Sequence, residues 1–158
     1  GADVPICLDP RPRIMRGIGD VRSAPIVLPE LPAILVNPGV SLPTGNVFAL
    51  LDRSRAACDP ATIAFEGGSP ELQDEAALLA YMARNANDLE APAIALRPVI
   101  GDVLSALRAL PGCRLARMSG SGATCFALFE REHAAANAKR LKSEHPGWWV
   151  RATMLGAG

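Results

Sequence analysis

The chain lacks several features that would assign it to a simple class of protein. Its 16 lysines and arginines balance its 16 aspartates and glutamates, so the formal net charge is zero and no basic surface for nucleic acid is expected. One tyrosine and two tryptophans provide no aromatic platform for single-stranded nucleic acid. No run of about 18 apolar residues occurs, so no membrane-spanning helix is expected.

The cysteines also lack a pattern of their own. They are spread along the chain, at Cys7, Cys58, Cys113 and Cys125. No CxxC pair occurs, and His133 and His145 are isolated, so we expect buried reduced thiols, no metal site and a cytoplasmic protein. Residues 1–5 carry neither an initiator methionine nor a signal-peptide pattern, which is typical of a chain cut from a longer one.

The composition predicts a folded domain. Apolar residues make up 49% of the 158 residues and charged residues 20%, which favours a buried core and argues against disorder. A chain of this length holds one domain, or one domain and part of another. Residues 1–30 are rich in proline, and we expect a helical or turn segment, one strand and a linker there.

After this segment, hydrophobic periodicity predicts alternating strands and helices. We expect strands at 33–36, 114–118, 124–129 and 148–154, and helices at 71–84, 89–96, 98–110 and 132–143, with another helix after Thr44. Residues 53–70 are polar and rich in Pro, Gly and Ala, and are expected to form a loop. The order predicts an α+β fold of the ferredoxin-like split β-α-β type, with an enlarged first helical layer.

The most informative segment is Ser119-Gly120-Ser121-Gly122, called the glycine loop below. Glycine tolerates positive φ and close approach of other groups, so this loop can direct several N–H groups at an anion. A tight hairpin turn with solvated serines explains the same spacing equally well. The loop lacks the lysine and helix of a Walker loop and the spacing of a Rossmann fingerprint. It is therefore no complete nucleotide site, although it can form one wall of a shared site.

Three polar positions outside the glycine loop allow a chemical interpretation. Asp3 could accept a proton from a substrate hydroxyl, although capping a turn ahead of a proline is the commoner role. Thr44 could bond a substrate or cap the helix that follows, and capping is again commoner. Residues 87–90, Asn-Asp-Leu-Glu, lie between two predicted helices, and helix capping explains most of this polar group.

The order of several segments resembles one kinase family. They are residues 1–5 (Gly-Ala-Asp-Val-Pro), 17–20 (Gly-Ile-Gly-Asp), 37–44 (Asn-Pro-Gly-Val-Ser-Leu-Pro-Thr), 87–90 and 118–126. Together they look like the 4-diphosphocytidyl-2-C-methyl-D-erythritol kinases, a family of the GHMP small-molecule kinase superfamily; the glycine loop alone would indicate only the superfamily. The resemblance covers nearly the whole chain but only the carboxy-terminal part of such a kinase. It implies that residues 1–30 are a remnant of the amino-terminal, ATP-binding domain and that residues 31–158 are the GHMP carboxy-terminal domain.

The resemblance implies ATP-dependent phosphorylation of the 2-hydroxyl of 4-diphosphocytidyl-2-C-methyl-D-erythritol, in the non-mevalonate (MEP) isoprenoid pathway. Asp3 matches the catalytic base, and Thr44 matches a position that holds the methylerythritol part of the substrate. Ser119, Gly120, Ser121 and Gly122 match the loop near the transferred phosphate. ATP and Mg²⁺ would be held mainly by the amino-terminal domain, whose phosphate loop and lysine are not in this chain. The chain alone is therefore expected to be inactive.

Two other interpretations stay open. A ferredoxin-like ligand-binding or regulatory module without catalysis would have the same order of elements. Another GHMP kinase, acting on homoserine or mevalonate, would differ only in its substrate. For the kinase we expect ATP and a small-molecule substrate as partners and neither nucleic acid nor a membrane, while the sequence leaves the oligomeric state open.

Overall fold

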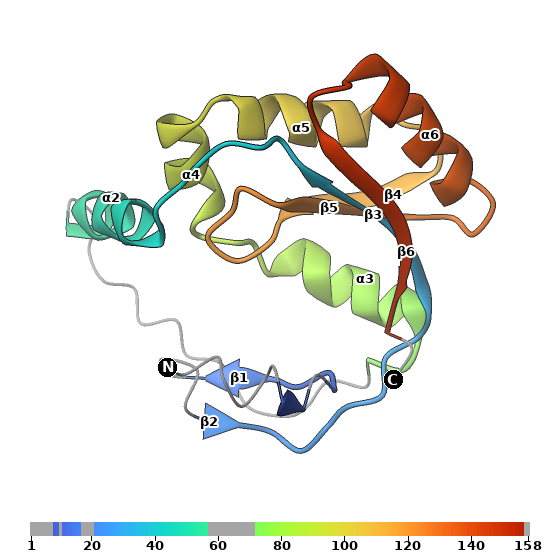
Figure 1. Cartoon of the computed structure of the whole chain (residues 1–158). Helices are drawn as coiled ribbons and strands as arrows, with labels where there is room; N and C mark the ends of the chain where they lie inside the picture. Colours follow the sequence, from blue (N-terminus) through green and yellow to red (C-terminus); the bar gives the residue numbers. More distant parts are fainter. Residues whose placement is uncertain (1–7, 10, 17–20, 57–71, 157–158) are drawn as a thin grey trace.

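The computed structural model describes residues 8–9, 11–16, 21–56 and 72–156 (Figure 1). Its centre is a four-stranded antiparallel sheet, built from β3 (Leu31–Asn37), β4 (Cys113–Met118), β5 (Cys125–Phe129) and β6 (Trp149–Leu155). The strands lie side by side in the order β4-β5-β3-β6, and each pair is antiparallel. This is the strand order of a split β-α-β arrangement, so the predicted α+β, ferredoxin-like fold is confirmed.

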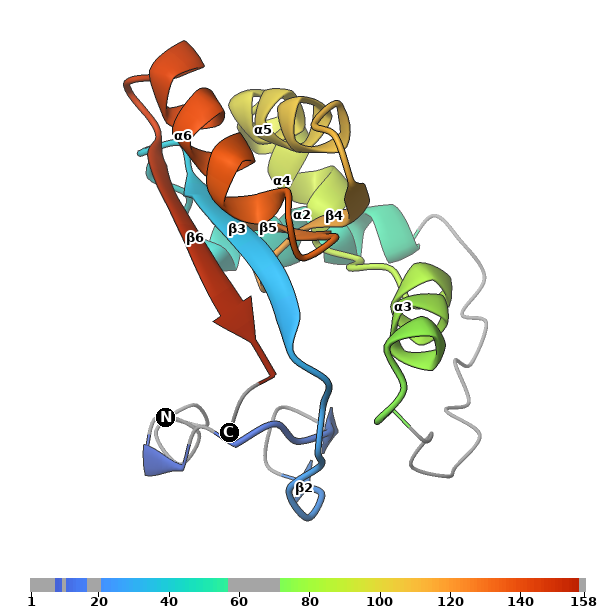
Figure 2. The same cartoon turned by 90° about the vertical axis from the view of Figure 1, so that its right-hand side faces the viewer.

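Helices cover both faces of this sheet. They are α2 (Thr44–Ala56), α3 (Glu75–Arg84), α4 (Glu90–Leu96), α5 (Val99–Arg108) and α6 (Ala134–Glu144). In Figure 1, α5 and α6 lie above the sheet and α3 lies below it, and in Figure 2 α3 again lies apart from α5 and α6; α2 packs next to α4. None of the helices in the described ranges is long and apolar enough to cross a membrane.

The two faces of the sheet follow from the alternation of side chains along each strand. Ile34 and Val36 point to the face under α5 and α6, where both are fully buried. Leu31 and Ala33 point to the opposite face, where they pack in a second cluster with Leu78 of α3. A strand with a buried apolar row on both faces reads as a continuous hydrophobic run, which is why this strand was predictable.

Helix α5 presents an apolar stripe to the sheet. Its four fully buried side chains are Ile100, Val103, Leu104 and Leu107. They recur at intervals of three and four residues, so they share one helix face. Pro98 immediately precedes the helix, where its missing N–H costs no hydrogen bond. Local sequence and tertiary packing therefore agree on this element.

Several expectations about local structure are wrong. The loop expected over 53–70 begins too early, because α2 continues to Ala56; residues 57–71 lie outside the described residues. Arg53 and Ser54 lie within the helix, and their side chains donate hydrogen bonds to the carbonyls of Ala49 and Leu50, at 3.1 and 3.0 Å. Polar side chains of this kind are compatible with an exposed helix face.

The second correction concerns residues 1–30, for which we expected one strand. The described part of this segment contains two strands of two residues each, β1 (Met15–Arg16) and β2 (Val21–Arg22), paired antiparallel. Such short paired strands carry too few residues for an alternating pattern, so periodicity could not reveal them.

The described cysteines behave as predicted. Cys113 and Cys125 are free thiols, the first half-buried and the second buried. Burial, together with the negative charge of Glu90, raises the pKa of Cys125 to about 12. Burial also raises the pKa of Cys113. Both thiols are therefore neutral near pH 7, while Cys7 and Cys58 lie outside the described residues.

The stripe of α5 can be tested by truncating one leucine. We expect Leu104→Ala to lower the free energy of unfolding by about 2–5 kcal/mol, because it removes buried methyl groups and leaves a cavity. Leu8→Ala is the matched control, since Leu8 is 81% exposed, and it should change stability by less than about 0.5 kcal/mol. Urea unfolding of the chain measures both, and equal effects of the two variants would contradict the packing.

Candidate functional site

The start of α2 lies against the glycine loop. The hydroxyl oxygens of Thr44 and Ser121 are 2.9 Å apart, a hydrogen bond between residues that are 77 positions apart in the chain. The structure therefore brings together two of the predicted site residues. Thr44 does not cap α2 as expected, because the helix already begins at Thr44 and the hydroxyl bond found for it is the one with Ser121.

The glycine loop closes β4 and β5 in a tight turn. Ser119 donates its N–H to the carbonyl of Thr124 at 2.8 Å, and Gly122 donates to the carbonyl of Ser119 at 3.0 Å. Among the described residues, no hydrogen-bond acceptor is found for the N–H groups of Gly120 and Ser121. The exposed tip of the loop therefore presents N–H groups that can donate hydrogen bonds to an anion.

Glycine is required at the end of the loop for two reasons. Gly122 has a φ of +86°, in the left-handed region that favours glycine. A Cβ at this position would lie 2.7 Å from Sδ of Met118 and 3.1 Å from Cδ2 of Leu42. Gly120 also has a positive φ, +55°, but a Cβ there would meet nothing within 4 Å. The loop is thus closely packed against Met118 and Leu42 at Gly122, whereas Gly120 has open space around it.

The polar group at 87–90 does more than the predicted capping. The N-cap of α4 is Leu89, which has no side-chain cap, so Asn87 and Asp88 are not N-cap residues. Asn87 Oδ1 accepts the N–H of Leu89 at 3.0 Å, two residues on, which is an Asx turn. The Nδ2 group of Asn87 and the carboxylate of Glu90 both reach the end of β4 instead. These contacts with the residue that precedes the glycine loop were missed from the sequence.

A second missed residue lies at the end of β3. Asn37 donates from Nδ2 to the hydroxyl of Thr124 at 2.9 Å and accepts the N–H of Gly39 through Oδ1 at 2.8 Å. It therefore ties the segment that leads to Thr44 to the first residues after the glycine loop. In the sequence, Asn37 stood out only as part of the segment 37–44 that carries the family resemblance, and no local signal indicated the partner at Thr124.

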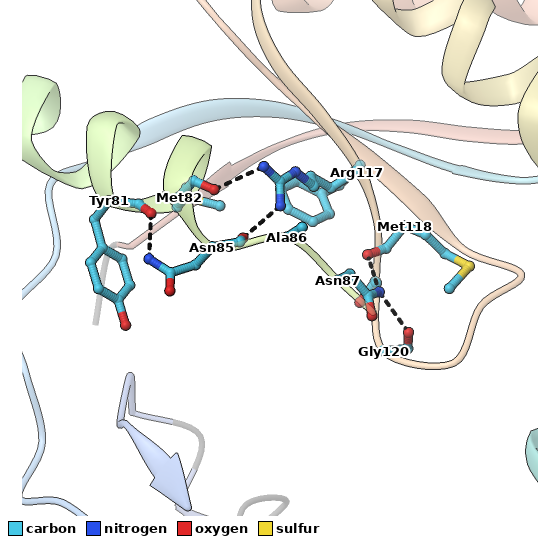
Figure 3. A pocket seen from close by; sticks show the side chains of 10 residues that line it. Tyr81, Met82, Asn85, Ala86, Asn87, Arg117, Met118 and Gly120 are labelled. Carbon is cyan, nitrogen blue, oxygen red and sulfur yellow. Dashed lines mark hydrogen bonds between the residues drawn. The ribbon is translucent and has the colours of Figure 1, made fainter. Parts of the chain in front are cut away.

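A pocket of about 360 Å³ borders the glycine loop on the α3 side (Figure 3). Its walls include Tyr81 and Met82 of α3, Phe126 of β5 and Gly120 of the loop. Arg117 lies in the wall, where its guanidinium donates to the carbonyls of Asn85 and Met82 at the end of α3, at 2.6 and 2.8 Å (Figure 3). The charge of Arg117 is thus directed at the carboxy-terminal end of a helix, which attracts cations.

The remaining predicted site residue, Asp3, lies outside the described residues. The lysines Lys139 and Lys142 are exposed on α6. In the described ranges, one group of side chains could hold a metal ion: Glu130, Glu132 and His133. It follows the far end of β5 from the glycine loop, so it does not belong to this site.

The different surroundings of the two loop glycines predict different costs of substitution. Gly122→Ala should destabilise the chain by about 3 kcal/mol, because a strained φ and a clash with Met118 add together. Gly120→Ala is the matched control, with strain but open space, and should cost about 1 kcal/mol. Thermal or urea unfolding measures the stability of both variants. A larger loss of stability for Gly120→Ala than for Gly122→Ala would contradict the described packing.

Comparison with known proteins identifies what this chain is similar to. Residues 69–145 match the family model described as GHMP kinases C terminal. A 4-diphosphocytidyl-2-C-methyl-D-erythritol kinase of Methylobacterium radiotolerans is 52% identical, over 98% of this chain and 53% of the relative. The protein of the same name from Xanthobacter autotrophicus is 49% identical, over 98% of this chain and 54% of the relative. The chain thus spans about half the length of the curated relatives it matches.

Two solved structures have a fold similar to that of this chain. A crystal structure of 4-(cytidine 5'-diphospho)-2C-methyl-D-erythritol kinase superposes with a TM-score of 0.73 at 32% identity, covering 100% of this chain and 55% of that one. An L. major mevalonate kinase in complex with R-mevalonate has a TM-score of 0.50 at 18% identity, over 84% of this chain and 45% of the other, which shows a likeness of fold alone. The family match and the first structure together show that this chain contains a GHMP kinase carboxy-terminal domain.

Proposed function

We propose that this chain is the carboxy-terminal part of an ATP-dependent kinase that phosphorylates the 2-hydroxyl of 4-diphosphocytidyl-2-C-methyl-D-erythritol, in the non-mevalonate pathway of isoprenoid synthesis. The observation that carries the proposal is the 2.9 Å contact between the hydroxyls of Thr44 and Ser121. It joins the position assigned to the substrate with the loop assigned to the transferred phosphate. The names of relatives near 50% identity support the same substrate.

Phosphoryl transfer requires mainly positioning and charge stabilisation from the protein. The N–H groups of Gly120 and Ser121 at the open loop tip can face the oxygens of the transferred group and stabilise their charge. The hydroxyl of Thr44 can donate one hydrogen bond and accept others, so it can serve Ser121 and a substrate hydroxyl together. Both groups lie on an exposed surface, where a substrate can reach them.

Asp3 completes the proposed reaction as the general base. Its carboxylate would accept the proton of the 2-hydroxyl while that oxygen forms a bond to the γ-phosphorus of ATP and the bond to ADP breaks. The products are the phosphorylated alcohol, ADP and a proton on Asp3. A carboxylate suits this role because the substrate hydroxyl loses its proton only as the new bond forms.

ATP supplies the phosphoryl group, and magnesium would accompany it. We place most of the contacts to both in an amino-terminal domain that precedes residue 31, with residues 1–30 as its last part and 31–158 as the carboxy-terminal domain. The family match over 69–145 falls within the second of these ranges. The N–H groups of the glycine loop fit a phosphate, whereas we assign no described residue to magnesium.

The role of Asp3 can be tested in the protein expressed from the whole reading frame that encodes this chain. Asp3→Asn keeps the shape of the side chain but cannot accept the proton, so kcat should fall by about 100-fold or more with little change in KM. Asp9→Asn is the control for a nearby loss of charge. A steady-state assay with the diphosphocytidyl substrate measures both variants, and near-normal turnover of Asp3→Asn would remove Asp3 from this role.

The role of Thr44 is tested in the same protein by Thr44→Val, which replaces the hydroxyl with a methyl group. We expect KM for the alcohol substrate to rise about tenfold, since one hydrogen bond contributes about 1 kcal/mol or somewhat more. Thr44→Ser should restore most of the affinity, and Thr153→Val on β6 should have no effect. Unchanged KM for Thr44→Val, or faster turnover of homoserine or mevalonate than of the diphosphocytidyl alcohol, would contradict the proposed substrate site.

A further inference from the structure

We propose that Asn87 and Glu90, at the start of α4, are positioning residues that hold the glycine loop in its working shape. Neither residue is expected to touch substrate, and both act through the backbone of β4 and the loop. The inference rests on the proposed function for its kinetic consequences. Its structural part, the control of the loop by two side chains of another element, can be tested independently of any activity.

Asn87 holds the loop directly. Its Nδ2 group donates to the carbonyls of Met118 at 3.0 Å and Gly120 at 2.8 Å, so one side-chain amide binds both the last residue of β4 and the second residue of the loop (Figure 3). Its Oδ1 atom accepts the N–H of Leu89, which fixes the orientation of the amide. The three bonds together use the acceptor and both donor directions of an asparagine side chain.

Glu90 holds the same residue of the strand, Met118, through its N–H. Its Oε2 atom accepts the N–H of Met118 at 3.0 Å, and its Oε1 atom lies 3.4 Å from Nη2 of Arg108 on α5. Both carboxylate oxygens thus have a partner, and the ion pair with Arg108 orients the acceptor. A hydrogen bond to an ionised group is stronger than one between neutral groups.

The position of β4 explains why these two bonds matter. β4 is an edge strand of the sheet, and in an antiparallel pair each residue directs its N–H and C=O together, either toward its partner strand or away from it. Met118 directs both groups to α4, where Glu90 and Asn87 take the place of a further strand. The strand is therefore fixed at the residue from which the loop departs.

A purely local role for Asn87 makes a different prediction. An Asx turn needs only the Oδ1 atom, and aspartate forms such turns as well as asparagine does. Asn87→Asp therefore keeps the turn before α4 but replaces the Nδ2 donor by an oxygen that faces the carbonyls of Met118 and Gly120. If Asn87 served only the turn, this exchange would be nearly neutral.

The first test measures the loop in the 158-residue chain by amide hydrogen exchange. In Asn87→Asp we expect exchange at Ser119 and Gly122, whose N–H groups are bonded within the loop, to become at least about tenfold faster, because local opening follows the loss of local contacts. Exchange within α4 should not change. Asn85→Asp is the matched control, since its Nδ2 group donates to the carbonyl of Tyr81 at 2.7 Å and not to the loop.

The second test measures kinetics in the protein from the whole reading frame. Asn87→Asp should lower kcat about 10- to 100-fold while KM changes less than about threefold, because a displaced loop misplaces the transferred group without removing a substrate contact. Glu90→Ala should act in the same direction, and Glu90→Gln, which keeps an acceptor for the N–H of Met118, should recover most of the rate. If Asn87→Asp fails to fold, the two Glu90 variants decide the question.

The outcomes separate the two proposals. A wild-type protein that does not phosphorylate the alcohol overturns the proposed function, whereas the exchange measurement still decides whether Asn87 and Glu90 hold the loop. Exchange rates of the loop within twofold of wild type in Asn87→Asp overturn the positioning role. Faster exchange with unchanged kcat in an active kinase overturns it as well, because the loop shape would then not matter to catalysis.

Discussion

The candidate site depends on the burial of one face of the sheet beneath α5 and α6. Val36, Phe129 and Leu104 are buried there, as are Met118 and Ala123 on either side of the glycine loop. At roughly 25 cal/mol per Å² of apolar surface, such burial is the dominant favourable contribution to folding. Because this core extends to both residues that flank the loop, the loop departs from a rigid base and only its tip is open to solvent.

Neutral polar groups, and not an array of charges, then shape the loop. The amide of Asn87 can be partly buried at a lower cost than an ion, because it is hydrogen-bonded, and the exposed hydroxyl of Thr44 bonds Ser121. The one carboxylate in the arrangement, Glu90, has a partner on each oxygen. A loop tip that presents N–H groups is suited to a ligand that brings its own negative charge, as a phosphate does.

The elements of the fold follow from local patterns. The spacing of Ile100, Leu104 and Leu107 predicts α5, and Pro98 predicts its start, because a helix stripe and a missing N–H are properties of neighbouring residues. The end of α2 could not be predicted in this way. Arg53 and Ser54 resemble loop residues, yet each bonds a carbonyl of the preceding turn. The amino-acid composition shows only that this segment is polar. Whether a polar segment is a loop or an exposed helix depends on the hydrogen bonds that its backbone geometry allows.

By itself the sequence determined the order of strands and helices, the α+β class and the identity of the glycine loop, because periodicity and glycine chemistry act over a few residues. Only the tertiary structure decided which side chains meet at that loop. Thr44 and Ser121 are 77 positions apart, and Asn87 and Gly120 are 33 apart. Contacts of this length are set by the stacking of helices on the sheet, so a polar group that resembles a helix cap becomes a support for the glycine loop.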